Sequence, residues 1–509
     1  MQDGEPLQAL PYLVAARREG EAGDTLLRPG DRRPATVDRS DPAALGYPPT
    51  MFALPGITGL IIFLLVRPQE FIPLLQRVPF LHLFTVFAML GWLIDVRLRR
   101  ADPNPTPGLR WVLAFLGWTL LSTAVAAPEN FITRVVDDVI IFSIYGTIAH
   151  SIQRFRTFQM VAGAVVAAAM FITLVCFHQG IGEMQCIGGE EGIGEIFGNP
   201  DGRTCNNMEA CMGPGAEPGL EYRCEHVGLF GTYSVEERVR YRGDLHDPNE
   251  VALTISAGGL SLLIAFMLRK RDMFAKLLCL VGAGIVVSTV YLTQSRGGLV
   301  SATLVPGVYL LRRYGIRGVL LAGVVMVPVL LTGSRGGESA DMSTQLRYEA
   351  WGVGLQMFYQ HPLFGVGAGM FQHHHFLTAH NSFVLTLGEL GFVGHVLFTI
   401  IIYLSLKTLI VGLRELSGVP GAAVARVWGM ALLASMSGIV FQILTLSFAY
   451  HPVLWIFIGL IGAWSSAIRH HRPSFAIRIT TTDLFGVIAG CLMFVFIGLP
   501  VFLRLKGAQ

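Results

Sequence analysis

Two arginines and a histidine are the residues best placed to do chemistry, because each lies in a short polar segment between apolar stretches. Arg296 lies in TQSRGG, Arg347 begins an R-x3-W pattern, and His380 lies in AHNS. An arginine at the mouth of an apolar bundle is costly unless it is paired or hydrated, and adjacent glycines let the chain turn and a ligand approach. A histidine at a helix start is poised for proton transfer near neutral pH. The alternatives are a snorkelling arginine and a simple helix cap.

A fourth polar segment, DLHDPNE, ends at Glu250. Asp247 and the following proline predict a turn, and Asn249 predicts a helix cap. The same two side chains, Asp247 and Asn249, could also bind sugar hydroxyls, as could Asn381 beside His380.

Other patterns argue against metal and nucleotide chemistry. The glycines of HPLFGVGAGMF, after His361, predict a tight backbone turn. Three adjacent histidines follow at 373–375, but neighbouring residues share no face of a helix or strand, and no carboxylate or cysteine is spaced to complete a tetrahedral site. The chain has no GxxxxGK[ST], strand-linked GxGxxG or GxSxG motif. We therefore expect no metal and no cofactor.

The composition defines the elements that must position these residues. Apolar residues make up 52% of the 509, and charged residues only 14%, against about 25% in soluble proteins. The 38 basic and 35 acidic residues nearly balance, which gives no sign of a nucleic-acid partner. The fold class predicted is all-α, a polytopic transmembrane helical bundle of about 12–13 spans with a large periplasmic loop region.

The candidate spans are stretches of mostly apolar residues near the length that a membrane requires. They are 51–67, 79–96, 109–127, 133–150, 159–178, 250–268, 274–293, 297–312, 317–333, 382–411, 422–447, 452–468 and 483–503. The stretch 382–411 is long enough to extend out of the bilayer. Residues 1–50, rich in Pro, Gly, Arg and Asp, contain no long apolar run and predict a flexible tail.

Basic residues follow every second span, and the positive-inside rule makes these connections cytoplasmic. They are Arg97, Arg99, Arg100, Arg154, Arg156, Arg269, Lys270, Arg271, Arg312, Arg313, Lys407, Arg414, Arg426, Arg469 and Arg472. The tail is then cytoplasmic, and two long segments near 179–249 and 334–381 face the other side. In the second of them, Arg347, Trp351 and Leu355 recur at helical spacing, which predicts an amphipathic helix along the membrane surface.

Four of the seven cysteines, Cys186, Cys205, Cys211 and Cys224, lie in the first long segment. An even cluster in an extracytoplasmic loop predicts two disulfides, with three pairings open. A metal site is the alternative, although the spacings lack CxxC.

The polar segments, in this order, resemble the bacterial O-antigen ligase and polymerase-like family of inner-membrane glycan transferases. The likeness is close over roughly 230–400, through DPNE, TQSRGG, LRYEAW, HPLFGVGAGMF and AHNSFVLTLGELGFVG; outside it, only RPQEFIPLL, which begins at Arg67, is similar. The resemblance implies a GT-C-like architecture and a glycan carried on undecaprenyl diphosphate. It also implies that Arg296 and Arg347 hold the diphosphate and that His380 is the catalytic base or positions the acceptor, without metal or nucleotide. The 179–249 segment is longer than expected for the family.

Two acceptors fit this resemblance. A ligase attaches the glycan to lipid A–core, whereas a polymerase adds it to a second lipid-linked repeat unit; we favour the ligase slightly. A transporter or flippase of the same lipid explains the bundle but not the histidine.

We therefore divide the chain into six segments. These are a flexible cytoplasmic tail (1–50), N-terminal transmembrane helices (51–178), a Cys-containing periplasmic loop (179–249), transmembrane helices with the SRGG motif (250–333), a periplasmic catalytic loop (334–381) and C-terminal transmembrane helices (382–509).

Overall fold

The computed structural model describes residues 51–507, except 104–105, 192–195, 270–271, 319, 322 and 325–337. The predicted tail 1–50 lies outside the described residues, and so does most of the predicted span 317–333.

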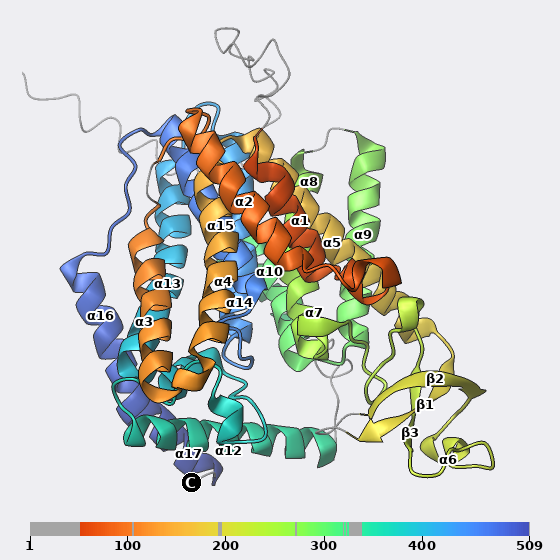
Figure 1. Ribbon diagram of the computed structural model, residues 1–509. Coiled ribbons are helices and arrows are strands. Elements are labelled where there is room, and N and C mark those ends of the chain that lie inside the picture. Colours follow the sequence, from red (N-terminus) through yellow and green to blue (C-terminus); the bar gives the residue numbers. More distant parts are fainter. Residues whose placement is uncertain are drawn as a thin grey trace, which may run out of the picture.

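Helices packed side by side form a bundle, which confirms the predicted all-α polytopic fold (Figure 1). Each of the remaining predicted spans coincides with helical structure. The bundle helices are α1 (Ala53–Leu65), α2 (Phe80–Arg97), α3 (Leu109–Ala126), α4 (Phe131–Ser151), α5 (Phe155–Ile181), α7 (Pro248–Thr254), α8 (Ser261–Arg269), α9 (Met273–Leu292), α10 (Arg296–Tyr314), α13 (Ser382–Glu415), α14 (Ala423–Gln442), α15 (Pro452–His471), α16 (Thr481–Met493) and α17 (Leu499–Lys506). A π-helical stretch, Ile255–Leu260, joins α7 to α8, and a second, Phe494–Gly498, joins α16 to α17.

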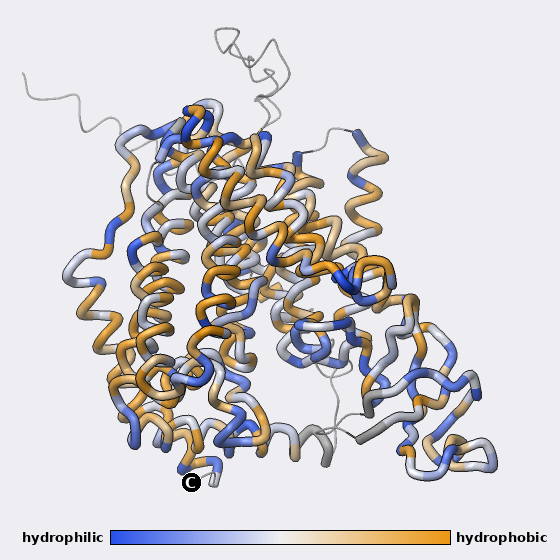
Figure 2. The backbone as a smooth tube through the Cα atoms, in the orientation of Figure 1, coloured by the Kyte–Doolittle hydropathy of each residue, from blue (hydrophilic) through white to orange (hydrophobic). Residues whose placement is uncertain are grey.

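Nine helical segments among the described residues are long and apolar enough to cross a membrane, and α1 is a shorter apolar helix. Figure 2 shows the apolar residues concentrated along these helices. The helices α4 and α10 lie in the same bundle, although they are not among the nine. For α4 the reason is its three charged residues, Arg134, Asp137 and Asp138.

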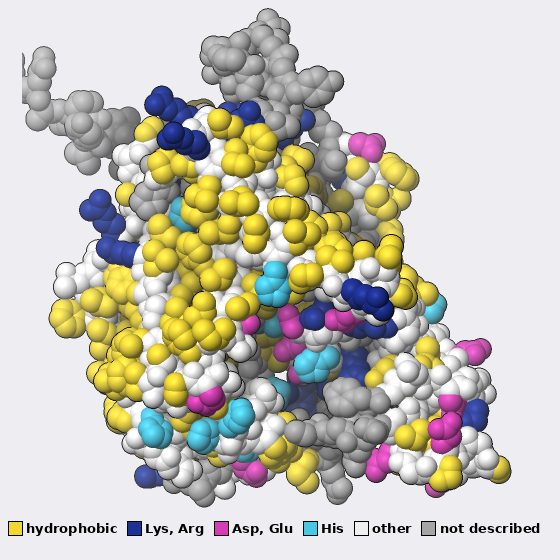
Figure 3. Space-filling model, viewed as in Figure 1, with side chains coloured by type: hydrophobic (Ala, Val, Ile, Leu, Met, Phe, Trp, Pro, Cys, Tyr) yellow, Lys and Arg dark blue, Asp and Glu magenta, His cyan; other side chains and the backbone are white. Residues whose placement is uncertain are grey.

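The two ends of the bundle differ in charge and in what covers them. Lys and Arg side chains gather at the upper end in Figure 3, which we call the basic end. At the opposite end, which we call the outer end, a small sheet and the helix α12 (Glu338–Gln360) cover the bundle (Figure 1). This separation is the one that the basic connections predict.

The predicted amphipathic helix is real and is longer than its motif. α12 runs across the outer end of the bundle, transverse to the spans (Figure 1). Trp351 and Tyr348 pack against Phe502 of α17, with ring centroids 5.5 and 5.2 Å apart, and Leu355 is buried. Aromatic packing therefore fixes the face of α12 that carries Arg347.

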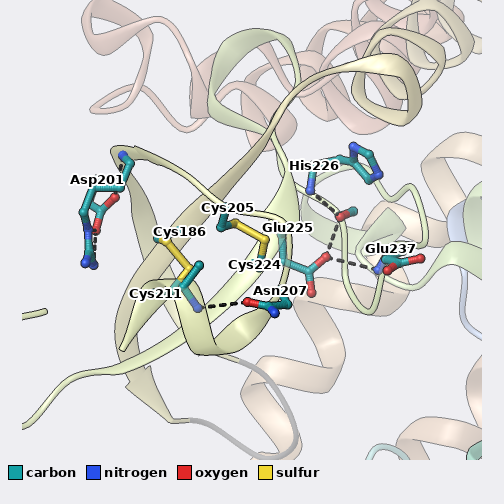
Figure 4. Close-up of a disulfide and its surroundings, with 12 residues drawn as sticks. Cys186, Asp201, Cys205, Asn207, Cys211, Cys224, Glu225, His226 and Glu237 are labelled. Atoms are coloured by element: carbon teal, nitrogen blue, oxygen red, sulfur yellow. Dashed lines mark hydrogen bonds and ion pairs between the residues drawn. A yellow bond between two sulfur atoms is a disulfide. The ribbon is translucent and has the colours of Figure 1, made fainter. Parts of the chain in front are cut away.

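The Cys-containing segment forms an antiparallel sheet that we did not predict. The strands β1 (Met184–Glu191), β2 (Ile196–Thr204) and β3 (Glu221–His226) lie in the order β2-β1-β3, beside the short helix α6 (Met208–Cys211). Two disulfides, Cys186–Cys211 and Cys205–Cys224, hold the sheet to its connections (Figure 4). The disulfide prediction is confirmed, and one of its three possible pairings is present.

A glycine-rich loop before α13 packs directly on a kink in that helix. At the kink, Gly391 has φ +65°, and a Cβ there would lie 2.3 Å from the carbonyl oxygen of Leu363. The loop amides of Val366 and Gly367 donate to the carbonyls of Gly388 and Glu389. Gly365, Gly367 and Gly369 all have positive φ, so the predicted tight turn is confirmed.

Candidate active site

Asp247, Asn249 and the start of α7 form one wall of the site. Asp247, and not Asn249 as the sequence suggested, is the N-cap residue, because its carboxylate accepts the backbone N–H of Asn249 at 2.8 Å. The Asn249 side chain is thereby released from capping and also donates to Asp247. The prediction that Asn249 caps α7 was wrong; the proline at the first helical position puts the cap one residue before it.

Asn249 joins three distant parts of the chain. Its side-chain oxygen accepts from the Ser295 hydroxyl at 2.6 Å and from the guanidinium of Arg238 at 3.4 Å. Its backbone carbonyl accepts from Gln442, at the end of α14, at 2.7 Å. These contacts bring the DPNE segment, the SRGG segment and the α14–α15 connection together.

The SRGG segment is built differently from our prediction. The sharp turn falls at Gln294, which has φ +49°, and not at the glycines. Ser295 is the N-cap of α10, and Gly298 lies in its first turn, where a Cβ would lie 2.3 Å from that of Ala252 in α7. The second glycine therefore allows α10 and α7 to pack closely, and this packing sets Arg296, which is exposed, at the first position of α10.

His380 lies in a left-handed backbone conformation, with φ +45°. Non-glycine residues rarely adopt this region, although histidine does so more often than most, and such residues cluster at functional sites. The next residue, Asn381, is buried and caps α13 by accepting the N–H groups of Phe383 and Val384. Asn381 therefore has a structural task, and its contact with substrate stays a prediction.

The α14–α15 connection fixes the start of α13 against the bundle. The backbone N–H of Ser382 donates to the carbonyl of Ile443, and its hydroxyl donates to Leu446 and accepts from the N–H of Phe448. Farther back on this connection, the hydroxyl of Thr445 lies 3.4 Å from the position of a Cβ on Gly297. One connection therefore contacts both the His380 segment and the Arg296 segment.

Arg347, His380 and Asp247 are close enough for their charges to shift the pKa values of His380 and Asp247. Burial is the main reason that the pKa of His380 falls to about 4; the charge of Arg347 adds to the fall, and Asp247 opposes it. Burial alone would raise the pKa of Asp247, but His380, Arg238 and Arg347 outweigh it, so this pKa lies below its ordinary value. At neutral pH the site therefore contains a neutral histidine beside an ionised carboxylate and two arginines.

Arg238 is a site residue that our sequence analysis missed. Besides Asn249, its guanidinium bonds the carbonyl of Thr293 at 3.0 Å, in the TQSRGG segment. Arginine recurs at alternate positions shortly before DPNE, at Arg238, Arg240 and Arg242, and this pattern could have indicated that Arg238 belongs to the site.

The sheet braces the turn that presents Arg238 (Figure 4). The buried carboxylate of Glu225, on β3, accepts the Ser234 hydroxyl and the N–H groups of Glu236 and Glu237. Both glutamates of that turn have positive φ. The RPQE segment supports the chain shortly before DPNE, because Arg67 forms ion pairs with Asp244, at 3.1 Å, and with Glu70.

Figure 3 shows a hollow at the outer end, between the bundle and the sheet, where histidine, acidic and basic side chains gather. Among the described residues, one group of side chains has the spacing of metal ligands, namely Cys186, Cys205 and Cys211, with sulfur atoms within 4.8 Å of one another. All three are oxidised in the two disulfides and therefore supply no thiolate.

The structure connects the predicted site residues to different degrees. It brings Arg347, His380 and Asp247 into one electrostatic cluster, and Asn249 lies against Asp247. Arg296 is linked to this cluster through its neighbour Ser295, which bonds Asn249.

The fold and this site define a polytopic membrane protein with an arginine-bearing polar hollow at one end of its bundle. Residues 281–399 match a family model described as O-antigen ligase, which supports the O-antigen ligase-like resemblance that the motifs indicated. The match includes Arg296, Arg347 and His380 but begins after the DPNE segment. It supports a ligase- or polymerase-type membrane enzyme of O-antigen and lipopolysaccharide biosynthesis. No curated protein matched the chain.

Proposed function

We propose that the protein transfers a glycan from undecaprenyl diphosphate to lipid A–core at the periplasmic face of the bacterial inner membrane. The observation that carries this proposal is the cluster of Arg347, His380 and Asp247 at the outer end of an apolar bundle. A lipid diphosphate lies at the membrane surface, where the long surface helix α12 presents Arg347.

In this proposal the arginines bind the diphosphate. Arginine offers planar paired donors that match phosphate oxygens, and it stays charged at every working pH. Arg347 and Arg296 come from separate elements, and Arg238 adds a third guanidinium on the Asn249 side. As the bond between the anomeric carbon and the diphosphate breaks, negative charge grows on the leaving group, and cations already in place stabilise it without reorganising.

His380 is the proposed general base. Its low pKa leaves a free imidazole nitrogen at neutral pH. An acceptor hydroxyl attacks the anomeric carbon from the side opposite the diphosphate and inverts it, while its proton passes to His380 and the electron pair of the broken bond leaves with undecaprenyl diphosphate. A bound diphosphate offsets the charge of Arg347, which raises the pKa of His380 when the base is needed, and Asp247 stabilises the imidazolium that forms.

Substitution of the two central residues tests the proposal. His380→Asn tolerates positive φ but removes the base, and we expect transfer to fall by about 10²–10⁴-fold. Arg347→Gln should cause a comparable loss, with both proteins present in the membrane in normal amounts. His374→Ala, in the same loop and exposed, is the matched control and should transfer normally. Normal surface polysaccharide in both site variants would refute the mechanism.

The glycan products of a strain that lacks the gene distinguish lipid A–core from a lipid-linked repeat unit as the acceptor. Loss of a ligase leaves long glycan chains on the carrier lipid and bare core on a gel, whereas loss of a polymerase leaves core that bears single repeats. Single repeats would establish the alternative, polymerisation of lipid-linked units.

The orientation has its own test. A cysteine placed at exposed His374, in a variant without the three cysteines outside the disulfides, Cys176, Cys279 and Cys491, should react with a membrane-impermeant reagent from the periplasm. Labelling from the cytoplasm alone would contradict the proposed topology.

A further inference from the structure

A second arginine-lined cavity lies near the basic end of the bundle. It has a volume of about 370 Å³ and lies between the start of α3, the end of α15 and the extended segment 472–480. Three arginines line it, one from each element: Arg110, Arg469 and Arg478. In Figure 1 this extended segment runs along the outside of the bundle and leads to α16.

The described residues that line this cavity include no aspartate or glutamate. Arg110 lies over the ring of Trp111 at 5.3 Å, and Arg469 donates to the hydroxyl of Ser466 at 3.2 Å; neither partner is negative. The nearby carboxylate of Asp483 is engaged by Lys407 at 2.5 Å and by the hydroxyl of Tyr403. Three like charges around one cavity favour an anion inside it.

Most of the remaining lining is apolar, apart from Thr106 and Ser465. Leu109, Leu113, Phe475 and Ile477 share the wall with the arginines. A cavity that is lined by both arginines and apolar side chains, at the end of a membrane bundle, suits a molecule with a charged headgroup and hydrocarbon chains. Basic pockets between transmembrane helices on the cytoplasmic side bind the headgroups of anionic lipids in this way.

We propose that this cavity binds the phosphate headgroup of an anionic phospholipid of the phosphatidylglycerol type. The three guanidinium groups bond the phosphodiester, and the acyl chains lie along the apolar wall on the α3 side. The segment 472–480 is thereby held against α3 and α15 when lipid is bound. The cavity lies away from the outer hollow, so the inference does not rest on the proposed glycan transfer.

The test uses the full-length protein in an uncharged detergent, with dioleoylphosphatidylglycerol as the probe and dioleoylphosphatidylcholine as the zwitterionic comparison. Native mass spectrometry counts bound lipid across a titration. We expect the wild type to bind the anionic lipid preferentially. The variant R110Q/R469Q/R478Q should bind it about 100-fold more weakly, because each arginine near a membrane surface contributes roughly fivefold.

The control variant R97Q/R414Q/R472Q removes three exposed arginines that do not line the cavity. It should bind phosphatidylglycerol as the wild type does. Equal loss in both triple variants would show general charge attraction and overturn the site, as would equal binding of the two lipids by the wild type. If the cavity variant fails to fold, Arg478→Gln alone, on the exposed segment, must still weaken binding several-fold.

Inorganic phosphate distinguishes a free anion from a lipid. At concentrations equal to the lipid's it should neither displace phosphatidylglycerol nor protect the protein against thermal unfolding. Displacement by phosphate at equal concentration would show that the cavity recognises the anion alone, and would refute a lipid site.

Discussion

Two clusters of charged side chains among the described residues, an inner network and an outer cluster, are built in different ways. The inner network comprises Arg134, Asp138, Thr119, Glu389 and Tyr450. Arg134 and Asp138 form an ion pair whose side chains are 7% and 4% exposed, Thr119 donates to Asp138, and the ring of Tyr450 lies 4.4 Å from the guanidinium. The outer cluster is Arg347, His380, Asp247 and Arg238.

The difference lies in what satisfies each charge. In the inner network the carboxylate and the guanidinium satisfy each other, and α4 supplies both. In the outer cluster the residues come from separate elements, since Arg347 lies within α12 while Asp247 caps α7 and His380 precedes α13 with positive φ. Backbone strain at such a place persists only when the surroundings impose it, and it is associated with function. The inner network is thus built around an ion pair within one helix, whereas the outer cluster joins elements that are distant in the sequence.

The largest effect that follows from this comparison is on stability. Arg134→Met leaves Asp138 buried without its partner, and we expect a loss of about 3–5 kcal/mol in unfolding free energy. Resistance of the purified protein to unfolding by sodium dodecyl sulfate measures this loss.

The double variant R134M/D138L separates the pair from its isolated charge. It should recover most of the lost stability, because removing both partners of a buried ion pair is often neutral. Arg347→Gln, in the outer cluster, should unfold as the wild type does. A large destabilisation by Arg347→Gln would mean that the two regions do not differ as described.

Glu389 connects the two regions, and its substitution should have an intermediate effect. Its carboxylate accepts the N–H of Phe371 at 3.0 Å, where the segment leading to His380 begins. Glu389→Ala leaves that buried N–H unpaired and lets the segment shift. We expect turnover to fall by up to about 100-fold, since a shift near 1 Å is enough for this.

Glu389→Gln keeps an oxygen that can accept the same bond and should retain most of the turnover. If Glu389 acts only by positioning, the alanine variant loses kcat while the acidic limb of its pH profile stays where it is in the wild type. A displaced limb, or equal losses in both variants, would instead mean that Glu389 takes part in proton transfer.

The sequence was informative where one residue type has one physical meaning. Apolar stretches marked the spans because backbone in lipid must be helical or paired. The positive φ of Gly365, Gly367 and Gly369 could be foreseen from glycine alone, and an even cysteine count predicted bridges.

The features that the sequence did not predict depend on contacts between residues that are distant in the chain. Gly298 was expected at a turn, but the residue it meets, Ala252, is 46 positions earlier, and no local pattern contains that contact. Arg238 is drawn into the site by Thr293 and Asn249. Glu389 has an ordinary place in an apolar helix until the kink at Gly391 brings the glycine-rich loop against it.

The smallest predicted effect is the shift of one pKa, and it distinguishes the outer cluster from histidines that are merely buried. Burial and Arg347 hold the pKa of His380 at about 4, while His451, at the start of α15, has a pKa lowered to about 4 by burial, with Asp244 opposing. Hydrogen–deuterium exchange at the C2 position of each histidine, read by mass spectrometry across pH 3–8, reports both pKa values.

In Arg347→Gln the titration midpoint of His380 should rise toward its ordinary value, because a positive neighbour is gone, and the midpoint of His451 should not change. In Asp247→Asn the midpoint for His380 should fall, because the carboxylate that favours its protonation is gone. A His380 midpoint that does not respond to either change would mean that the three side chains do not form one electrostatic unit, and the outer cluster would then resemble the inner network after all.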